Sequence, residues 1–231
     1  MKILGIDTAN KSCSVAIVDN GSTLAEQTLV STQTHSKHLM EMVGAVIELS
    51  SLALSELDGF AVTIGPGTFT GLRIGISSVK GLAYATGKPV VGISSLDALA
   101  MQSPFLPYLT AVFIDARKSE VYCARYRYSN SKKQQIKLIK ETVEQVLPPE
   151  KAVSGINEPC IFIGSGAVLY KRIIEEKLNA PAYFASDCQN MIQASTIANL
   201  ALEKFQGNIF DDLNSLAPHY IRKSDAQIKN M

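Results

Sequence analysis

Short apolar runs separated by polar turns dominate the beginning of the chain. Residues 2–7 and 14–19 are apolar strands, and the second strand leads into Asn20-Gly21, a dipeptide that readily takes positive φ in a tight turn. Residues 24–30 continue the pattern. The sequence therefore predicts a meander of antiparallel strands at the start of the fold.

A helical spacing of apolar residues follows at about residues 36–52. Its main apolar stripe consists of residues three or four positions apart, namely Leu39, Met42, Val43, Val46 and Leu49. Met40 and Ile47 lie beside this stripe and widen it. Because one buried face does not account for all of these residues, we expect the helix to contact two neighbours.

A β-loop-α-β unit is predicted next. Residues 60–64 have the pattern of a buried strand, Gly65-Pro66-Gly67 interrupts it, residues 70–85 are helical, and residues 90–93 form the next strand. The chain then becomes aperiodic around residues 101–107. We place a domain boundary here.

The boundary defines an N-terminal subdomain of residues 1–102 and a C-terminal subdomain of residues 103–231, whose tail can pack back on the first. A strand at 109–115 ends in Ile114-Asp115-Ala116-Arg117-Lys118-Ser119, which repeats the pattern of Ile6-Asp7-Thr8-Ala9-Asn10-Lys11-Ser12. This repeat predicts two copies of one domain that begins with a β-hairpin.

The remaining pattern also alternates between strands and helices. Strands are predicted at 160–163 and 183–186, helices at 166–178 and 193–205, and a polar loop at 128–135. The fold class is therefore α/β.

Composition narrows the functional classes. Hydrophobic residues make up 46% of the 231 residues, which is enough for a core, and 22 Lys and Arg against 21 Asp and Glu give a net charge of +1. This balance does not indicate a nucleic-acid or membrane surface. The four cysteines lack Cys-x-x-Cys spacing, and no apolar run approaches the ~20 residues of a membrane span. We expect a cytoplasmic protein with reduced thiols.

The turn after the first strand is a candidate phosphate site. Its backbone N–H groups and the side chains of Thr8 and Asn10 could face a phosphate, with Asp7 orienting a magnesium-bound water. The alternative is an ordinary strand end, in which Asp and Asn act as turn formers.

The glycine-rich loop at residues 65–73 is a second candidate. It precedes a helix, so its amides and the helix dipole could hold an anion near Arg73, with Thr70 as the N-cap. Alternatively, the small residues on one side of the helix allow another backbone to approach: Gly71, Gly75 and Ser78. Both interpretations remain open.

Other polar groups are less informative. His35 and His38 lie three positions apart, but Lys37 lies between them, so we interpret them as first-turn residues rather than metal ligands. A basic group alternates with tyrosines along a predicted hairpin: Arg117, Lys118, Arg125, Arg127, Lys132 and Lys133. It could suit RNA, although a solvated edge hairpin is the favoured interpretation.

Four segments together resemble the TsaB family, also called YeaZ. They are Gly5-Ile6-Asp7-Thr8-Ala9, residues 34–39, residues 65–75, and Pro218-His219-Tyr220-Ile221-Arg222. The resemblance implies an actin-like ATPase (ribonuclease H-like) fold, with two similar subdomains each led by a β-hairpin meander. It also implies a noncatalytic scaffold that acts with TsaD and TsaE to form N6-threonylcarbamoyladenosine next to the anticodon of tRNAs reading codons that start with A.

The resemblance carries further expectations. The paralogue TsaD holds its metal with a His-x-x-x-His pair, and Ser95 and Leu99 occupy the corresponding positions here. We therefore expect no catalysis, no metal and no cofactor of the chain's own, with ATP or ADP and magnesium used only in the complex. A vestigial nucleotide site would include Asp7, Thr8, Gly65, Gly67 and Thr68.

The family pairs through its first two helices, either with a second copy or with TsaD, and reaches tRNA through the complex. The expected interface comprises Leu39, Val43, Val46, Leu72, Gly75, Ile76 and Val79. On this hypothesis, Val79→Glu abolishes pairing and leaves the fold intact. The competing hypothesis is an actin-like ATPase or small-molecule kinase, which is weakened because residues 115–119 lack glycine.

Overall fold

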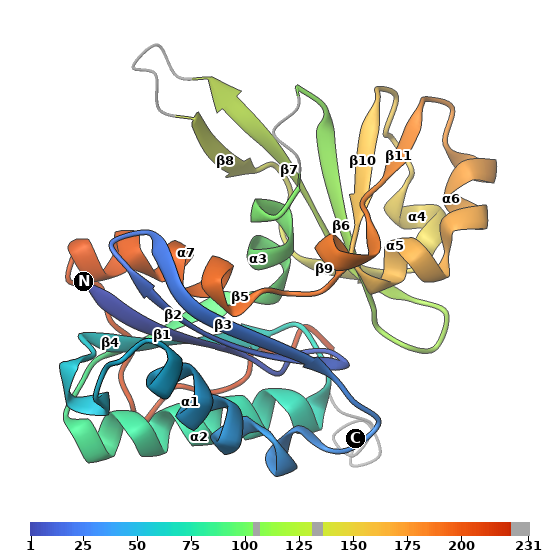
Figure 1. Cartoon of the computed structure of the whole chain (residues 1–231). Coiled ribbons are helices and arrows are strands. Elements are labelled where there is room, and N and C mark those ends of the chain that lie inside the picture. The colour runs from blue at the N-terminus through green and yellow to red at the C-terminus, as the bar shows by residue number, and fades with distance from the viewer. Residues whose placement is uncertain (104–106, 131–135, 223–231) are drawn as a thin grey trace. The chain divides into compact units, whose positions relative to one another are not determined.

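Figure 1 shows the computed structural model of the chain, which describes residues 1–103, 107–130 and 136–222. Contacts divide the chain into two compact units. The first unit comprises Met1–Ala98 and Ile192–His219, and the second comprises Leu99–Met191 and the residues from Tyr220 onward.

The first unit is built on a five-stranded sheet with the order β3-β2-β1-β4-β5. Its strands are β1 (Lys2–Asp7), β2 (Ser12–Asp19), β3 (Ser22–Val30), β4 (Gly59–Gly65) and β5 (Val90–Ser94). β1 pairs antiparallel with β2 and parallel with β4. Asn20 and Gly21 both have positive φ in the turn between β2 and β3, so the predicted meander is confirmed.

Helices cover both faces of this sheet (Figure 1). One face carries the 3-10 helix η1 (His35–Lys37), α1 (Leu39–Leu49), the 3-10 helix η2 (Leu54–Glu56) and α2 (Phe69–Thr86), and the other carries α7 (Ala194–Gln206). The N-cap of α2 is Thr68, whose hydroxyl accepts the N–H of Gly71. The predicted cap, Thr70, is therefore wrong by two residues, because the helix begins earlier than the apolar spacing indicated.

The second unit contains a sheet with the order β11-β10-β6-β7-β8, and β9 also pairs with β7. Its strands are β6 (Leu109–Asp115), β7 (Val121–Asn130), β8 (Ile136–Lys140), β9 (Gln145–Leu147), β10 (Cys160–Ile163) and β11 (Ala182–Phe184). Its helical segments are α4 (Pro149–Ala152), α5 (Ser165–Leu169), α6 (Lys171–Lys177) and the 3-10 helix η3 (Asp187–Asn190), while α3 (Ser95–Met101) spans the boundary between the units.

The two sheets repeat one topology. Each begins with an antiparallel hairpin, β1–β2 or β6–β7, and the first strand of each hairpin pairs in parallel with a later strand, β4 or β10. The next parallel strand, β5 or β11, completes each sheet. The predicted α/β fold of two similar subdomains is therefore confirmed.

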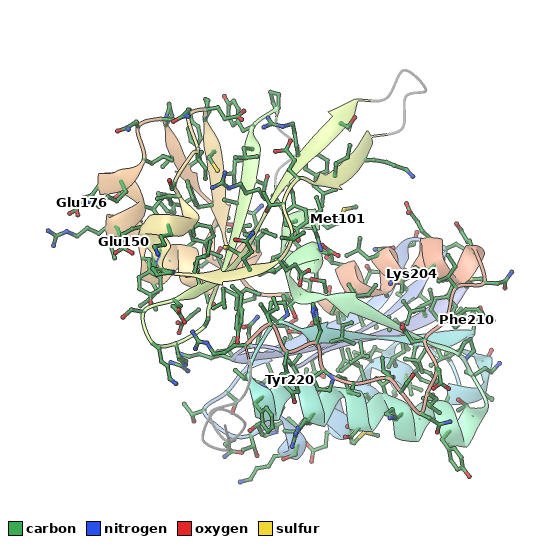
Figure 2. The ribbon with its side chains drawn as sticks, turned by 180° about the vertical axis from the view of Figure 1, so that it is seen from behind. Met101, Glu150, Glu176, Lys204, Phe210 and Tyr220 are labelled. Carbon is green, nitrogen blue, oxygen red and sulfur yellow. The ribbon has the colours of Figure 1, made fainter. Side chains whose placement is uncertain are left out.

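The boundary between units differs from the simple division after residue 102, because α7 belongs to the first unit. It packs on β1 so closely that a Cβ on Gly5 would lie 2.3 Å from the carbonyl oxygen of Ala194. Figure 2 shows α7 from behind, with Lys204 near its end and Phe210 on the segment that follows. Asp211 then pairs with Val90 at the edge of β5.

Two other expectations are corrected. The helix predicted at 166–178 is divided at Tyr170 into α5 and α6. The loop predicted at 128–135 includes the last three residues of β7, and residues 131–135 lie outside the described part. Within the part of the chain that the structure describes, every helix is too short or too polar to cross a membrane.

Candidate partner-binding site

Asp7 lies at the end of β1 and is completely buried. Its Oδ1 accepts the N–H of Ala9 at 3.1 Å and the hydroxyl of Thr63 at 2.8 Å, whereas Oδ2 has no hydrogen-bond partner among the described residues. Burial raises the pKa of Asp7 to about 7, although the two hydrogen bonds act in the opposite direction. The carboxyl group therefore holds a proton over much of the acidic range.

The glycine-rich loop packs directly against the turn that contains Thr8 and Ala9. A Cβ on Gly71 would lie 2.0 Å from the carbonyl oxygen of Thr8, and one on Gly67 would lie 2.5 Å from that of Ala9. The hydroxyl of Thr8 donates to the carbonyl of Gly71 at 2.7 Å, which locks the turn to the helix. The backbone that approaches these glycines belongs to the chain itself.

This packing favours the interpretation that the glycines of the loop allow another backbone to approach. The N–H of Thr68 donates to the carbonyl of Ala9 at 2.7 Å, and the N–H of Gly71 donates to the side chain of Thr68. The space beside the glycines is filled and these donors are already used. The N–H groups of Thr68 and Gly71 are therefore not free to bind a phosphate in the space beside these glycines.

The candidate nucleotide residues thus cluster for a structural reason. Asp7, Thr8, Gly67 and Thr68 lie around one turn. Gly65 has φ +119, and a Cβ there would lie 2.8 Å from the carbonyl oxygen of His219, whose N–H donates to Ile64. Gly65 consequently accommodates the C-terminal segment.

The corresponding turn of the second unit is arranged differently. Its Arg117, Lys118 and Ser119 all have positive φ, which L residues rarely adopt. The guanidinium of Arg222 donates to the carbonyl of Ala116 at 2.8 Å and forms an ion pair with Glu120. The arginine of the C-terminal motif therefore holds this turn in place.

The basic hairpin is engaged in contacts within the second unit. Arg125 donates to the carbonyls of Ala152 and Ser154, and Arg127 forms ion pairs with Glu141 and Glu158. The hydrogen bonds that Arg127 donates to Glu158 and Glu141 raise the pKa of its guanidinium further. These contacts favour the solvated hairpin over an RNA surface. Lys132 and Lys133 lie outside the described residues.

The two histidines at the start of α1 bind different groups. Nε2 of His35 lies 2.8 Å from the carbonyl oxygen of Asn10, and Nε2 of His38 lies 3.1 Å from Oε1 of Gln33. Among the described residues, no group of three or more His, Cys, Asp or Glu side chains is placed to hold a metal ion.

The expected partner interface requires a correction. Its seven residues are all buried within the first unit: Leu39, Val43, Val46, Leu72, Gly75, Ile76 and Val79. They form part of the core because the apolar stripes of α1 and α2 face the sheet. Val79 is 0% exposed, so Val79→Glu would place a charge in this core and damage the fold instead of testing pairing.

The exposed sides of α1 and α2 form an open groove of about 520 Å³. Its lining residues are Ser36, Leu39, Met40, Phe69, Thr70, Arg73, Ile74, Ser77 and Ser78. Met40 is 51% exposed and Phe69 is 44% exposed, and the guanidinium of Arg73 lies 3.7 Å from the centroid of the Phe69 ring. Methionine, aromatic residues and arginine are enriched in protein interfaces.

Two glycines on the same helices have no packing role within the chain. A Cβ built on Gly44 in α1 or on Gly81 in α2 would meet no atom within 4 Å among the described residues. Glycine in a helix interior costs about 1 kcal/mol relative to alanine. The space above these residues is therefore open to another backbone. The sequence contained this signal, but it did not show which glycines face outward.

A smaller pocket of about 200 Å³ adjoins the groove, and Thr70 and Ile74 line both. Its lining residues are Asn10, Lys11, Ser31, Gln33, Thr34, His35, Thr68, Thr70, Gly71 and Ile74. This lining contains one lysine and no acidic side chain. The sequence interpretation had assigned Asn10 to the turn and had given Lys11 no role.

Comparison with known proteins identifies the family. The family model for TsaD, tRNA N6-adenosine threonylcarbamoyltransferase, matches residues 23–230. A Bacillus subtilis protein named tRNA threonylcarbamoyladenosine biosynthesis protein TsaB is 29% identical over 99% of this chain and 97% of its own length. The chain belongs to the TsaB (YeaZ) branch of the TsaD family.

Solved structures agree with this assignment. YeaZ from Pseudomonas aeruginosa is 29% identical and superposes with a TM-score of 0.80 over 95% of this chain and 100% of that protein. A polyphosphate/ATP-glucomannokinase from Arthrobacter is 14% identical, with a TM-score of 0.51 over 89% of this chain and 99% of its own, which extends the likeness in fold alone to the actin-like ATPases.

Membership of the TsaB branch gives a context to Ser95 and Leu99. Both are completely buried, and the hydroxyl of Ser95 has no hydrogen-bond partner among the described residues. A buried leucine has no atom that can bind a metal. Ser95 and Leu99, which occupy the positions of the paralogue's histidines in the family resemblance, are therefore part of the interior of this chain.

Proposed function

We propose that this chain is a noncatalytic subunit of the machinery that forms N6-threonylcarbamoyladenosine in tRNA, and that it works with TsaD and TsaE. Family membership and the names of its TsaB relatives support a role in this modification. The observation that carries the scaffold role is the open groove between α1 and α2, together with the open space at Gly44, four residues after Met40, and at Gly81, four residues after Ser77.

The groove suits a helical partner. Its exposed apolar side chains offer area to bury, and the two glycines let a second pair of helices approach closely. We propose that TsaD binds here in the complex and that a second copy of the chain binds here when TsaD is absent. Contact with tRNA then occurs through the complex in the cytoplasm.

Nucleotide and magnesium belong to the other subunits in this proposal. The turn around Asp7 is filled by its own backbone, so the chain contributes shape and partner contacts rather than a phosphate site. Calorimetry of the purified chain with ATP and magnesium tests this point. Tight binding accompanied by turnover would favour the alternative of an actin-like ATPase or kinase.

Reconstitution of tRNA modification tests the main proposal. TsaD and TsaE with substrate tRNA should modify it efficiently only when this chain is added. Equal modification without the chain would contradict the proposal.

Variants of the groove locate the interaction. Met40→Glu and Ser77→Arg each place a charge on the groove surface and should abolish both pairing and modification while the chain stays folded. The matched control is Val143→Glu, which changes a 71% exposed apolar residue of the second unit. Loss of pairing in the control, or retained pairing in both groove variants, would contradict the proposal that the groove is the partner-binding site.

A further inference from the structure

The small pocket beside the groove is lined by residues whose side-chain donors are not used within the part of the chain that the structure describes. Asn10, Lys11 and Thr70 line it, and the side chain of none of the three forms a hydrogen bond or ion pair with any residue in the described ranges. Residues that carry an amide group, an ammonium group and a hydroxyl group therefore line one space of about 200 Å³.

The other polar side chains around this space are already paired. The hydroxyl of Thr68 accepts the N–H of Gly71, the hydroxyl of Ser31 accepts the N–H of Gln33, and His35 contacts the carbonyl of Asn10. Among the lining residues, Lys11 is the one lysine, and no acidic side chain of the lining balances its positive charge. The complementary group is an anion with two or more acceptor oxygens.

The position of the pocket indicates where this anion comes from. Thr70 and Ile74 line both the pocket and the apolar groove. A partner bound in the groove can therefore also contact the pocket. The pocket is large enough for a carboxylate side chain, and a carboxylate can accept hydrogen bonds from a lysine, an amide and a hydroxyl together.

We infer that the partner bound in the groove inserts the carboxylate of an aspartate or glutamate into this pocket, where Lys11, Asn10 and Thr70 bind it. This inference rests on the proposed function, because it describes the same contact surface. The apolar groove supplies contact area, and the pocket at one end fixes the direction in which the partner lies along α1 and α2. A partner that lacks the acidic residue leaves Lys11 without its counter-charge and binds less well.

Charge reversal at Lys11 tests the inference. The binding of TsaD to the full chain is measured by calorimetry for the wild type, Lys11→Glu and Lys11→Met. We expect Lys11→Glu to weaken binding about a hundredfold, because it places two carboxylates together, and Lys11→Met to weaken it about tenfold and to reduce its dependence on salt. Circular dichroism checks that each variant is folded.

Lys37 provides the matched control. It is exposed, lies in η1 near the pocket without lining it, and has no side-chain hydrogen bond or ion pair among the described residues. Lys37→Glu should change the affinity by less than about threefold, as expected for general electrostatic attraction. Equal effects of Lys11→Glu and Lys37→Glu would overturn the inference.

Carbodiimide coupling identifies the proposed acidic residue directly. This reagent joins an amine to a carboxylate in contact with it, so peptide mapping of the coupled complex should find Lys11 joined to one Asp or Glu of TsaD. Replacing that residue with lysine should then restore binding to Lys11→Glu. A complex that couples elsewhere but not at Lys11 would contradict the inference.

The outcomes separate this inference from the proposed function. If Met40→Glu abolishes binding and the Lys11 variants bind normally, the groove assignment holds and the carboxylate contact is wrong. If inorganic phosphate or ATP binds the isolated chain and Lys11→Met removes that binding, the pocket holds phosphate instead, which also overturns the inference. If neither set of variants affects binding, both proposals fail.

Discussion

The hairpin turns that open the two units share a sequence pattern but are stabilised in different ways. In the first, Asp7 is completely buried and its neighbours Thr8 and Ala9 pack against glycines of the following helix. In the second, the Asp115 side chain remains 18% exposed and accepts the N–H of Arg117, and Arg222 holds the turn from outside. The same topology thus supports one turn by close packing and hydrogen bonds against the following helix, and the other by an arginine of the C-terminal segment.

The difference follows from the residues that each turn meets. A helix with Gly71 and Gly75 can approach the first turn until its backbone touches Thr8. In the second unit, Gly166 approaches the carbonyl of Phe113 within β6 and the side chain of Val121, not the turn itself. The repeated motif therefore determines the hairpin, whereas glycines elsewhere determine its burial.

The largest expected difference between the turns concerns pH. The pKa of Asp7 is raised from 3.8 to about 7 in the folded chain, so the folded state retains a proton that the unfolded state loses. The contribution of protonated Asp7 to the free energy of unfolding is complete below pH 4 and is lost as the pH rises through 7. Asp7→Asn removes this pH dependence. Between pH 4 and pH 8, the free energy of unfolding of the variant should rise by about 4 kcal/mol relative to that of the wild type.

Urea unfolding across this pH range measures the effect, and Asp115→Asn is the control in the second turn. A difference between Asp7→Asn and the wild type that stays constant with pH would show that the buried carboxyl group titrates like an exposed one. The contrast between the two turns would then be one of packing only.

The second largest expected difference between the two turns is the loss of stability when a methyl group is added at Gly71 or at Gly166. Gly71→Ala places Cβ 2.0 Å from the carbonyl oxygen of Thr8 and should destabilise the chain by about 3 kcal/mol. Gly166→Ala meets the side chain of Val121 at 2.9 Å and the carbonyl of Phe113 at 3.0 Å, and it should cost about 1 kcal/mol. Denaturant midpoints compare the two, and equal losses would argue against the special packing of the first turn.

The contacts of Arg222 with the second turn can be removed by a single substitution. Arg222→Met eliminates the donor to Ala116 and the ion pair with Glu120, so the turn loses its clamp. We expect a loss of about 1.5 kcal/mol, measured as faster amide hydrogen exchange at residues 116–120. Arg222→Lys keeps the charge and should retain part of the protection. Unchanged exchange in Arg222→Met would show that the turn needs no clamp.

The smallest expected effect contrasts two glycines of one helix. Gly81→Ala meets only open space, so it should stabilise the isolated chain by about 0.7 kcal/mol while weakening its assembly through the groove. Gly71→Ala, in the same helix, acts in the opposite direction on folding. A gain in stability with unchanged assembly would mean that no partner backbone approaches Gly81.

Local patterns predicted most strands and the main helices of this chain. Apolar runs identified β1, β6 and β10, and the recurrence of the Asp7 motif at Asp115 indicated the duplicated topology. Short elements such as α4 and β9 were missed, because three or four residues do not establish a period. The return of α7 to the first unit depends on distant contacts, including the Ala194 backbone against Gly5.

The candidate site was predicted less well. The apolar stripes of α1 and α2 were recognised, but periodicity shows that a face is buried and not what buries it. Val46 and Val79 were therefore assigned to a partner although they contact the chain's own sheet. The widening of the α1 stripe by Met40 was the better signal, since Met40 lines the exposed groove.

The composition of the first unit has a consequence for synthesis on the ribosome. Its sheet needs α7, whose first turn is held by Glu26 and Ser14, and the segment up to His219, which bonds to the end of β4. All strands of the second unit have been made once Phe184 has emerged. β1 and β2 are therefore translated well before α7 and His219, and during this interval the nascent chain exposes the face of β1 and β2 that α7 later covers.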